Sequence, residues 1–482
     1  MADSDTYTSL IRGELYIAGQ WRPGRGGRLP VHDKYHQTLL GEVSLADGAD
    51  MEAAIAASVR GFETYRIWPA GRRQAVLETL AERLEAQQEA FAQLICAEAG
   101  KPIGYARGEV TRGLLTLRTA AAEAVRMAGE VVNIDYGVGI GRTAFTRRVP
   151  VGPVAAISPF NFPLNLALHK LAPALAVGNS ILLKPSPYAP LTALALAGLL
   201  ADTDLPAGAV QVILAKNAVA EAMVRDPRLR MLSFTGSPAV GWHLKELSGR
   251  KRVALELGGN AAVLIDDDTD LPAAARRVAV GAYLYAGQIC ISTQRIFVVE
   301  AVRDRFEALL LREIEALSVG DPADATTTVG PLIDLQHLRR VSDWVQEATA
   351  EGARCLAGGA LLSERRRLYA PTLLTDTRTG MKVRDEEIFG PVAVLESVPD
   401  FAAGLAAIND SRFGLQAGVF TGRLAHIQQA HARLEVGAVI INDVPGFRVD
   451  PMPYGGVKDS GLGREGLRYA MAEMTEPRLL VY

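Results

Sequence analysis

The first third of the chain has apolar side chains at the spacing of amphipathic helices. Residues 48–130 are rich in Ala, Leu, Glu and Arg, and apolar residues recur every three or four positions over residues 72–96. Asp47 is suited to cap one of these helices, and Pro69 to open another. Before them, the alternation in residues 14–21 predicts a short strand. The pattern therefore predicts a helical region preceded by a small β element.

From residue 151 onward, short apolar runs alternate with helical stretches. This strand–helix–strand order predicts a parallel, doubly wound sheet, which binds ligands at the carboxyl ends of its strands. The strands are predicted at residues 153–158, 180–184, 210–214, 231–234 and 253–257, and helices between them include residues 191–201 and 238–247.

A second α/β region is predicted over residues 260–447. Its strands are expected at residues 261–265, 294–299, 392–396, 418–420 and 438–441. Residues 129–151 differ, because β-branched residues and glycines alternate there, which predicts a projecting β-hairpin. A glycine-rich segment, a helix and an apolar strand over residues 478–482 close the chain.

Composition excludes several classes of protein. The 482 residues suggest two or three domains, and 49% hydrophobic with 22% charged residues is ordinary for a soluble globular protein. The net charge of -3 makes nucleic acid an unexpected partner. Three distant cysteines form no disulfide framework and no metal site, so we predict no catalytic metal and a reducing, cytoplasmic location. The N-terminus does not resemble a signal peptide, and no apolar run predicts a transmembrane helix.

Two residues are candidate reacting groups. Cys290 closely follows Gly287, which lets the backbone approach a ligand, and a thiolate is a strong nucleophile near neutral pH. Glu256 lies in an apolar strand that ends in two glycines, where burial would raise its pKa and suit a general base. On this evidence alone, a structural cysteine and a buried salt bridge remain open as alternatives.

Three further segments follow predicted strands. The amide of Asn161 could donate to an oxyanion, although it could equally stabilise a turn between prolines. Lys184 could meet a ribose or phosphate, or extend along the surface. Phe234-Thr-Gly-Ser opens a predicted helix whose backbone N–H groups could bind phosphate, although many α/β turns look similar.

Seven motifs occur in order along the chain. They are Ser158-Pro-Phe-Asn-Phe-Pro, Leu183-Lys-Pro-Ser, Phe234-Thr-Gly-Ser, Leu255-Glu-Leu-Gly-Gly-Asn, Gly287-Gln-Ile-Cys, Glu387-Ile-Phe-Gly-Pro and Pro453-Tyr-Gly-Gly-Val-Lys-Asp-Ser-Gly. Taken together they resemble the aldehyde dehydrogenase superfamily over essentially the whole chain. The 34-residue separation of Glu256 and Cys290 also matches that family.

The resemblance implies a catalytic mechanism. Cys290 would attack the aldehyde carbon, and Asn161 with the Cys290 N–H would hold the oxyanion. Hydride transfer to a nicotinamide would leave a thioester, which Glu256 would hydrolyse by activating water. Lys170 matches a lysine near that site and is expected to support its charge network.

The resemblance also implies an NAD or NADP site. Lys184 and Ser186 would meet the adenosine ribose, and Ser237 the pyrophosphate. Glu387 would hold the nicotinamide ribose and Phe389 would brace the ring, with Ser158, Phe160, Gly236 and Leu257 completing the cofactor site. Many NAD-preferring members carry a glutamate where this chain has Pro187, so we expect NADP to be at least tolerated.

The aldehyde itself is less well defined. Ile289 stands where some relatives that oxidise phosphorylated aldehydes have an arginine, and Ile291 and Phe162 add apolar walls. Arg112 and Arg448 could bind an anionic tail, although either could instead form a structural salt bridge.

The C-terminal motifs most resemble the lactaldehyde, succinate-semialdehyde and non-phosphorylating glyceraldehyde-3-phosphate dehydrogenase branch, which favours a short hydroxy- or carboxy-aldehyde. Two alternatives are a coenzyme A-acylating enzyme, against which Glu256 argues, and a catalytically silent protein on the same fold.

The same resemblance divides the chain into three parts. Residues 1–127 and 151–257 would form the NAD(P)-binding domain, and residues 258–450 the catalytic domain. Residues 128–150 and 451–482 would form an oligomerisation arm. Because an exposed strand arm invites pairing with another subunit, we expect a homodimer or homotetramer.

Overall fold

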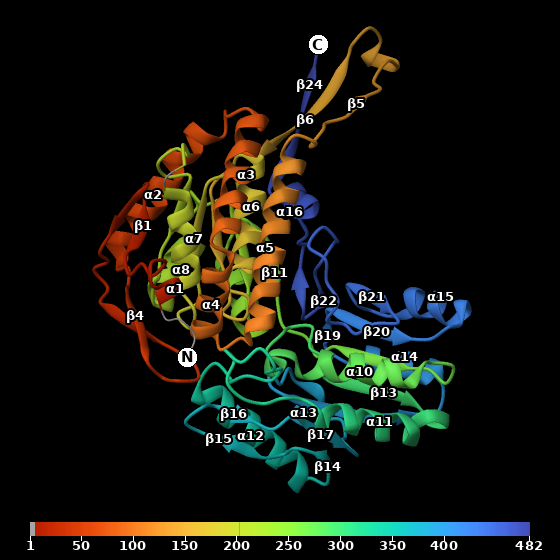
Figure 1. Ribbon diagram of the computed structural model, residues 1–482. Coiled ribbons are helices and arrows are strands. Elements are labelled where there is room, and N and C mark those ends of the chain that lie inside the picture. The colour runs from red at the N-terminus through yellow and green to blue at the C-terminus, as the bar shows by residue number, and fades with distance from the viewer. Residues whose placement is uncertain (1–4, 202) are drawn as a thin grey trace.

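The computed structural model describes residues 5–201 and 203–482 as an α/β protein with two large sheets, one above the other in Figure 1. The mixture of helices with largely parallel sheets is the predicted fold class. Among the helices in these ranges, none has the length and apolar character needed to cross a membrane.

The N-terminal region forms hairpins followed by four long helices. The single strand predicted over residues 14–21 is instead a hairpin of β1 (Leu15–Ile17) and β2 (Gln20–Arg22), because Ala18 and Gly19 adopt left-handed conformations that reverse the chain. Asp47 caps the first long helix in a capping box, as its position predicted. The remaining elements are α1 (Asp5–Thr8), β3 (Arg28–His32), β4 (Leu39–Ser44), α2 (Gly48–Tyr65), α3 (Ala70–Ala86), α4 (Gln88–Ala99) and α5 (Ile103–Ala124).

The upper sheet has eight strands in the order β2-β1-β9-β8-β7-β10-β11-β23. All five predicted parallel strands are present, as β7 (Val154–Ile157), β8 (Ile181–Lys184), β9 (Val210–Val212), β10 (Met231–Thr235) and β11 (Arg252–Glu256). Their helices are α6 (Asn165–Val177), α7 (Leu191–Ala201), α8 (Asn217–Arg225) and α9 (Pro238–Leu247). The strand order reverses between β7 and β10, and such a switch point opens a ligand crevice at the carboxyl ends of the strands.

The lower sheet has seven strands in the order β14-β17-β18-β13-β12-β20-β21. The strands are β12 (Ala262–Ile265), β13 (Arg295–Val299), β14 (Arg354–Ala357), β17 (Thr372–Thr375), β18 (Val392–Val398), β20 (Gln416–Phe420) and β21 (Ala438–Ile441). Its helices are α10 (Leu271–Tyr283), α11 (Arg303–Glu315), α12 (Leu335–Ala350), α13 (Lys382–Asp385), α14 (Phe401–Asn409) and α15 (Leu424–Arg433). Two short two-stranded sheets accompany it. One consists of β15 (Leu361–Ser363) and β16 (Leu368–Tyr369), and the other of β19 (Phe413–Gly414) and β22 (Val457–Lys458).

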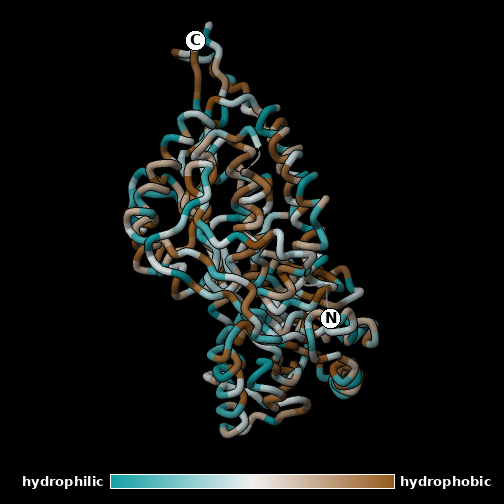
Figure 2. Tube along the Cα trace, turned by 60° about the vertical axis from the view of Figure 1, so that its left-hand side comes forward, coloured by the Kyte–Doolittle hydropathy of each residue, from teal (hydrophilic) through white to brown (hydrophobic). Residues whose placement is uncertain are grey.

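A three-stranded arm projects from the upper body (Figure 1). It consists of β5 (Val131–Val132), β6 (Ala144–Pro150) and the C-terminal β24 (Thr475–Val481). Figure 2 shows apolar residues along this arm next to the C-terminus, and Val131, Val138 and Leu480 are among its exposed side chains.

The arm is shorter than the segment expected from the sequence. Within residues 451–474, β23 (Gly461–Leu462) pairs with β11 of the upper sheet, β22 pairs with β19, and α16 (Leu467–Glu473) packs against α6. These residues therefore belong to the body, because their backbone groups and apolar side chains are satisfied there rather than on the arm.

Candidate active site

A cavity of about 690 Å³ lies between the two bodies at the carboxyl ends of the upper parallel strands. Residues from both bodies line it, with Glu256 at the end of β11 and Cys290 from the lower body. Twelve further residues discussed above also line it, namely Ser158, Phe160, Asn161, Lys184, Ser186, Pro187, Gly236, Ser237, Leu257, Phe234, Glu387 and Phe389. The fold thus brings distant motifs of the sequence to one site.

The loop that carries Cys290 is held in an unusual conformation. Tyr285 and Ala286 have φ of 52°, and Gly287 follows with φ of 67°. A Cβ on Gly287 would lie 2.1 Å from the carbonyl oxygen of Gly390, so only glycine fits there. The Gln288 side chain then donates to the carbonyl oxygens of Tyr285 and Pro331, and it accepts from the Ile333 N–H at 2.9 Å. The surroundings therefore fix a strained turn that presents the cysteine.

The groups around the Cys290 thiol shift its pKa in opposite directions. Burial raises its pKa to about 11, and Glu387 and Glu256 add to the rise. The Tyr454 hydroxyl, 3.0 Å from Sγ, and the guanidinium of Arg448 favour the thiolate instead. The flanking Ile289 and Ile291 pack with Leu415 and Tyr454 and form an apolar wall beside the sulfur.

Asn161 is buried in the loop between β7 and α6. Its Nδ2 donates to the carbonyl oxygen of Gln288 at 3.0 Å, which places the amide beside the cysteine loop. One Nδ2 hydrogen satisfies that bond, and an amide carries two. The geometry is compatible with a second donation to an oxygen bound at Cys290.

Glu256 is buried, and its Oε2 has no hydrogen-bond partner within the described ranges. Burial raises its pKa well above the usual value, and the nearby Glu465 raises it further against Arg448 and Lys170. A buried carboxyl with a raised pKa and an unused oxygen is suited to take a proton from water.

Lys170 on α6 does not itself bond Glu256. Its Nζ contacts Thr235 Oγ1 at 2.7 Å, Ser233 Oγ at 3.2 Å and Glu465 Oε1 at 3.1 Å. Burial alone would raise the pKa of Glu465, but Lys170, His169 and Arg448 outweigh it and hold the pKa low. Sequence reasoning assigned no role to Glu465, although a charged residue just after the glycines at 461 and 463 was a usable signal.

The far end of the cavity has features that fit a dinucleotide. Burial lowers the pKa of Lys184 to about 8, and within residues 5–201 and 203–482 its Nζ has only a long contact of 3.5 Å to the Pro185 carbonyl oxygen. The buried Ser158 Oγ lacks a partner in the described part of the chain. Ser237 lines the cavity and precedes α9 without a side-chain capping bond, so its hydroxyl and the N-terminus of α9 are available as donors for a phosphate.

Glu387 and Phe389 approach the same cavity from the lower body. Burial raises the pKa of Glu387 to about 7, and its Oε1 accepts from the Gly259 N–H at 3.1 Å. A Cβ on Gly258 would overlap this carboxylate, which explains the glycine two positions after the end of β11. Phe389 packs edge-on against Phe160, with 5.9 Å between ring centroids, so an aromatic wall closes this side.

Comparison with known proteins decides the family. The model of the aldehyde dehydrogenase family matches residues 21–480. The chain belongs to the aldehyde dehydrogenase family. It is therefore an oxidoreductase, an NAD(P)-dependent aldehyde dehydrogenase, as the motifs predicted.

Individual relatives match over nearly their whole length. A 3-sulfolactaldehyde dehydrogenase of Priestia megaterium is 41% identical over 98% of this chain and 98% of that protein. Among solved structures, aldehyde dehydrogenase 21 from Physcomitrella patens in complex with the reaction product succinate has 38% identity and a TM-score of 0.94, covering 97% and 98% of the two chains. Glyceraldehyde-3-phosphate dehydrogenase GapN from Methanocaldococcus jannaschii complexed with NADP has 35% identity and a TM-score of 0.90, covering 94% and 98%.

In this aldehyde dehydrogenase, the two candidate substrate arginines meet one buried network. Arg112 on α5 forms a two-pronged pair with Asp450, at 2.7 and 3.2 Å, and Asp450 also accepts from Asn165 and contacts His169 Nε2 at 2.8 Å. Burial alone would raise the pKa of Asp450, but the bonds with His169 and Arg112 outweigh it and hold the carboxylate ionised. Arg112 is thus partly committed to a structural ion pair.

Arg448 is more deeply buried. Its guanidinium lies 3.6 Å from the centroid of the Tyr454 ring, and its Nη2 is 3.4 Å from Glu465 Oε2. Its Nε has no partner among residues 5–201 and 203–482. Phe162 lies near Arg112, 5.7 Å from ring centroid to guanidinium carbon, and beneath Lys101 at 3.5 Å. Arg448 thus places a positive charge against Tyr454, which belongs to the apolar wall beside Cys290.

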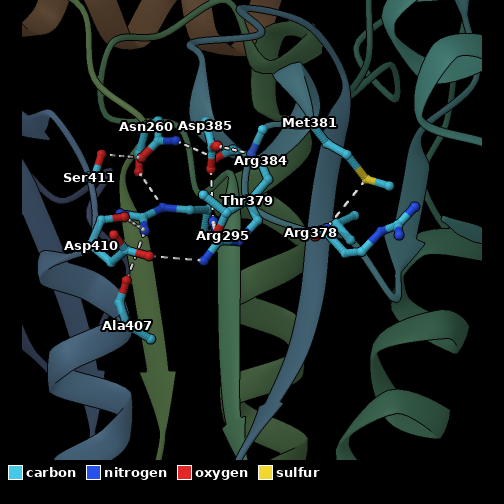
Figure 3. Close-up of polar contacts among 12 residues, drawn as sticks. Asn260, Arg295, Arg378, Thr379, Met381, Arg384, Asp385, Ala407, Asp410 and Ser411 are labelled. Atoms are coloured by element: carbon cyan, nitrogen blue, oxygen red, sulfur yellow. Dashed lines mark hydrogen bonds and ion pairs between the residues drawn. The ribbon is translucent and has the colours of Figure 1, made fainter. Parts of the chain in front are cut away.

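The asparagine of the Leu-Gly-Gly-Asn motif has a structural function (Figure 3). Asn260 donates to the carbonyl oxygen of Arg384 and accepts from Ser411, while its own carbonyl oxygen accepts from the buried Arg295. Arg295 also donates to carbonyl oxygens at the end of α14. This network fixes the crossing between the two bodies and the segment that leads to Glu387.

Proposed function

We propose that this enzyme oxidises a short aldehyde with a polar or anionic tail to the carboxylate, with Cys290 as nucleophile. The observation that carries the proposal is the meeting of Cys290, Asn161 and Glu256 at one end of a cavity whose other end fits a dinucleotide. The surroundings supply a nucleophile, an N–H donor and a base, which are the groups that acyl chemistry needs.

Each residue has a defined task. The Cys290 thiolate adds to the aldehyde carbon, and the negative charge moves to the oxygen, where Asn161 Nδ2 and the Cys290 N–H donate to it. NAD(P)⁺, when bound, accepts a hydride and so supplies the oxidation. Glu256 then takes one proton from a water that attacks the Cys290 thioester. The C–S bond breaks and restores the thiolate, and the carboxylic acid product loses its remaining proton to solvent as it leaves as the carboxylate. Lys170 holds Glu465 ionised, and the charge of Glu465 strengthens Glu256 as a base.

The cofactor is proposed to lie along the predicted residues. Lys184 and Ser186 would hold the adenosine ribose, Gly236 and Ser237 the pyrophosphate, and Glu387 the nicotinamide ribose, with Ser158, Phe160, Leu257 and Phe389 around them. Pro187 lines the cavity close to Lys184 in sequence and carries no charge to repel a 2′-phosphate. This supports use of NADP beside NAD.

The tail of the aldehyde is proposed to face Arg448 and Arg112. Both guanidinium groups lie on the side of Phe162 and Tyr454, where the apolar residues Ile289 and Ile291 leave little other polarity. The names of the relatives, which include sulfolactaldehyde and a succinate complex, support an anionic tail. A buried guanidinium with an unused N–H is the group that such a tail needs.

We also propose roles for the three parts of the molecule. The upper body binds the cofactor and the lower body carries Cys290. The arm of β5, β6 and β24 joins subunits into a dimer or tetramer, supported by its exposed apolar side chains. A cytoplasmic location is supported by the three free cysteines, one of them exposed.

The test is a panel of aldehydes with NAD or NADP, followed by reduced-nicotinamide absorbance. The panel contains succinate semialdehyde, sulfolactaldehyde, lactaldehyde, glyceraldehyde 3-phosphate and propionaldehyde, with Cys290→Ala as control. We expect an anionic or hydroxylated short aldehyde to be preferred, without added coenzyme A. A preference for propionaldehyde would overturn the tail assignment, and a requirement for coenzyme A would overturn hydrolysis by Glu256.

A further inference from the structure

The tyrosine of the C-terminal Pro-Tyr-Gly-Gly motif contacts the reacting sulfur. Tyr454 Oη lies 3.0 Å from Cys290 Sγ although the two residues are 164 positions apart. Tyr454 is 3% exposed, and its backbone exchanges hydrogen bonds with Glu465 in both directions, at 3.1 and 2.7 Å. Its ring packs against Ile291 and Leu415. Its position is therefore set by the surrounding backbone and by packing.

A cation covers the face of this ring. The Arg448 guanidinium lies 3.6 Å from the ring centroid and is itself buried beside Glu465. A positive charge on the face of a phenol withdraws electron density from it and makes its O–H a better donor. Glu465 therefore anchors both parts of the arrangement, through its backbone to Tyr454 and through its carboxylate to Arg448.

We propose that Tyr454 donates a hydrogen bond to the Cys290 thiolate, and that Arg448, stacked on its ring, positions and strengthens that bond. The inference deepens the proposed function, because it rests on Cys290 as the nucleophile. The donor direction follows from the phenol, which burial keeps protonated by raising its pKa well above the usual value. A thiolate is the stronger acceptor of the two sulfur forms.

The charges that face the sulfur make this bond consequential. Two carboxylates, Glu256 and Glu387, face it and disfavour the thiolate, as does burial. Tyr454 and Arg448 are the groups that act in the other direction. Without the hydroxyl, the sulfur would be desolvated beside two carboxylates with only the more distant guanidinium to compensate. When sulfur bonds to the aldehyde carbon its charge is lost, so the hydroxyl's contribution belongs to the resting thiolate.

The experiment measures alkylation of Cys290 by iodoacetamide against pH in the full-length enzyme without substrate. The Cys290 peptide is quantified by mass spectrometry, because Cys355 is exposed and also reacts. For Tyr454→Phe we expect the midpoint to move up by about one pH unit, which slows alkylation near neutral pH about tenfold. Tyr283→Phe is the matched control, since it removes another buried hydroxyl, bonded to the Thr372 carbonyl oxygen. Its midpoint should equal that of the wild type.

A second variant separates the two parts of the proposal. Arg448→Met keeps the hydroxyl but removes the stacked charge, so its midpoint should move in the same direction by less than in Tyr454→Phe. It also keeps the test decisive if Tyr454→Phe does not fold. An unchanged or lowered midpoint in Tyr454→Phe overturns the hydrogen bond, and an unchanged midpoint in Arg448→Met overturns the role of the guanidinium.

Turnover distinguishes this inference from the proposed function. If the wild type oxidises an aldehyde and the alkylation midpoint of Tyr454→Phe does not move, the role of the tyrosine alone is overturned. A moved midpoint in an enzyme that oxidises no aldehyde of the panel would overturn the function alone. If both hold, the activity of Tyr454→Phe should recover as pH rises, because more of its cysteine is then ionised. A loss that is equal at every pH would indicate a structural role only and would refute the proposal.

Discussion

Replacing Lys101 by methionine should destabilise the upper body far more than the same change at Arg107. Lys101 Nζ lies 2.5 Å from Glu109 Oε2, and the two side chains are 1% and 0% exposed. Arg107 forms an equally direct pair with Glu89, at 2.8 Å, but those side chains are 52% and 43% exposed. Both pairs involve α5, so the comparison isolates burial.

The magnitude follows from what each change leaves behind. Removing one partner of a buried ion pair costs about 3–5 kcal/mol, because the other charge stays buried. Glu109 Oε1 still accepts from the Leu164 and Asn165 N–H groups, at 2.9 and 3.0 Å, which favours the lower end, about 3 kcal/mol. Methionine keeps an apolar stem but loses the ammonium, which lies 3.5 Å from the centroid of the Phe162 ring. The exposed Arg107 pair should contribute less than about 1 kcal/mol.

The assay is urea unfolding followed by circular dichroism, with the change in free energy taken from the shift in midpoint and the slope. A double variant, Lys101→Met with Glu109→Gln, removes both charges and should recover part of the lost stability. Shifts for Lys101→Met and Arg107→Met that agree within about 1 kcal/mol would refute the reasoning, since burial would then make no difference.

Four further predictions concern activity. Asn161→Ala should lower kcat about 100- to 1000-fold with little change in KM, and a KM-only effect would contradict an oxyanion role. Glu256→Gln should keep one burst of reduced cofactor while steady turnover falls about 100- to 10,000-fold, and loss of the burst would count against it. Wild-type turnover should rise as pH increases from the acidic side, because the raised pKa of Glu256 leaves little base at low pH, and Glu256→Gln should lack that rise. Pro187→Glu should weaken NADP binding about tenfold relative to NAD by calorimetry, and equal weakening of both would contradict it.

The parallel strands could be predicted because most of their residues are apolar on both faces. All four residues of β8 are buried because helices cover both faces of the sheet, and its polar residue, Lys184, stands at the end of the strand. β14 was missed for the opposite reason, and its buried partner β17 was missed with it. β14 is an edge strand with exposed residues, and its pairing with β17 has a register shift, so it lacks a clear period. The two-residue strands β22 and β23 are set by their partners.

The residues of the site also fall into those that the sequence could predict and those that it could not. Residues that follow strands or glycines, such as Asn161, Glu256 and Cys290, could be placed because a local pattern marks them. The ion pairs could not, because their partners are far apart in sequence. Arg112 and Asp450 are separated by 338 positions, and nothing near either residue indicates the other. Tyr454 lay within a recognised motif, but only the fold brings its hydroxyl to the sulfur.

The buried charges around the substrate connect the proposed roles. Arg112, Arg448 and Lys170 form ion pairs with two carboxylates, Asp450 and Glu465, and burial together with Glu465 raises the pKa of Glu256. His169 is buried between them, which lowers its pKa.

Arg448, whose Nε has no partner in the described part of the chain, is placed between Tyr454 and the proposed position of an anionic tail. On the roles proposed above, a tail bound at Arg448 withdraws support from the resting thiolate at the moment when an aldehyde is in reach. The negative charge then gains by moving from sulfur to the oxygen held by Asn161. The preference for an anionic aldehyde and the reactivity of Cys290 would thus depend on the same guanidinium.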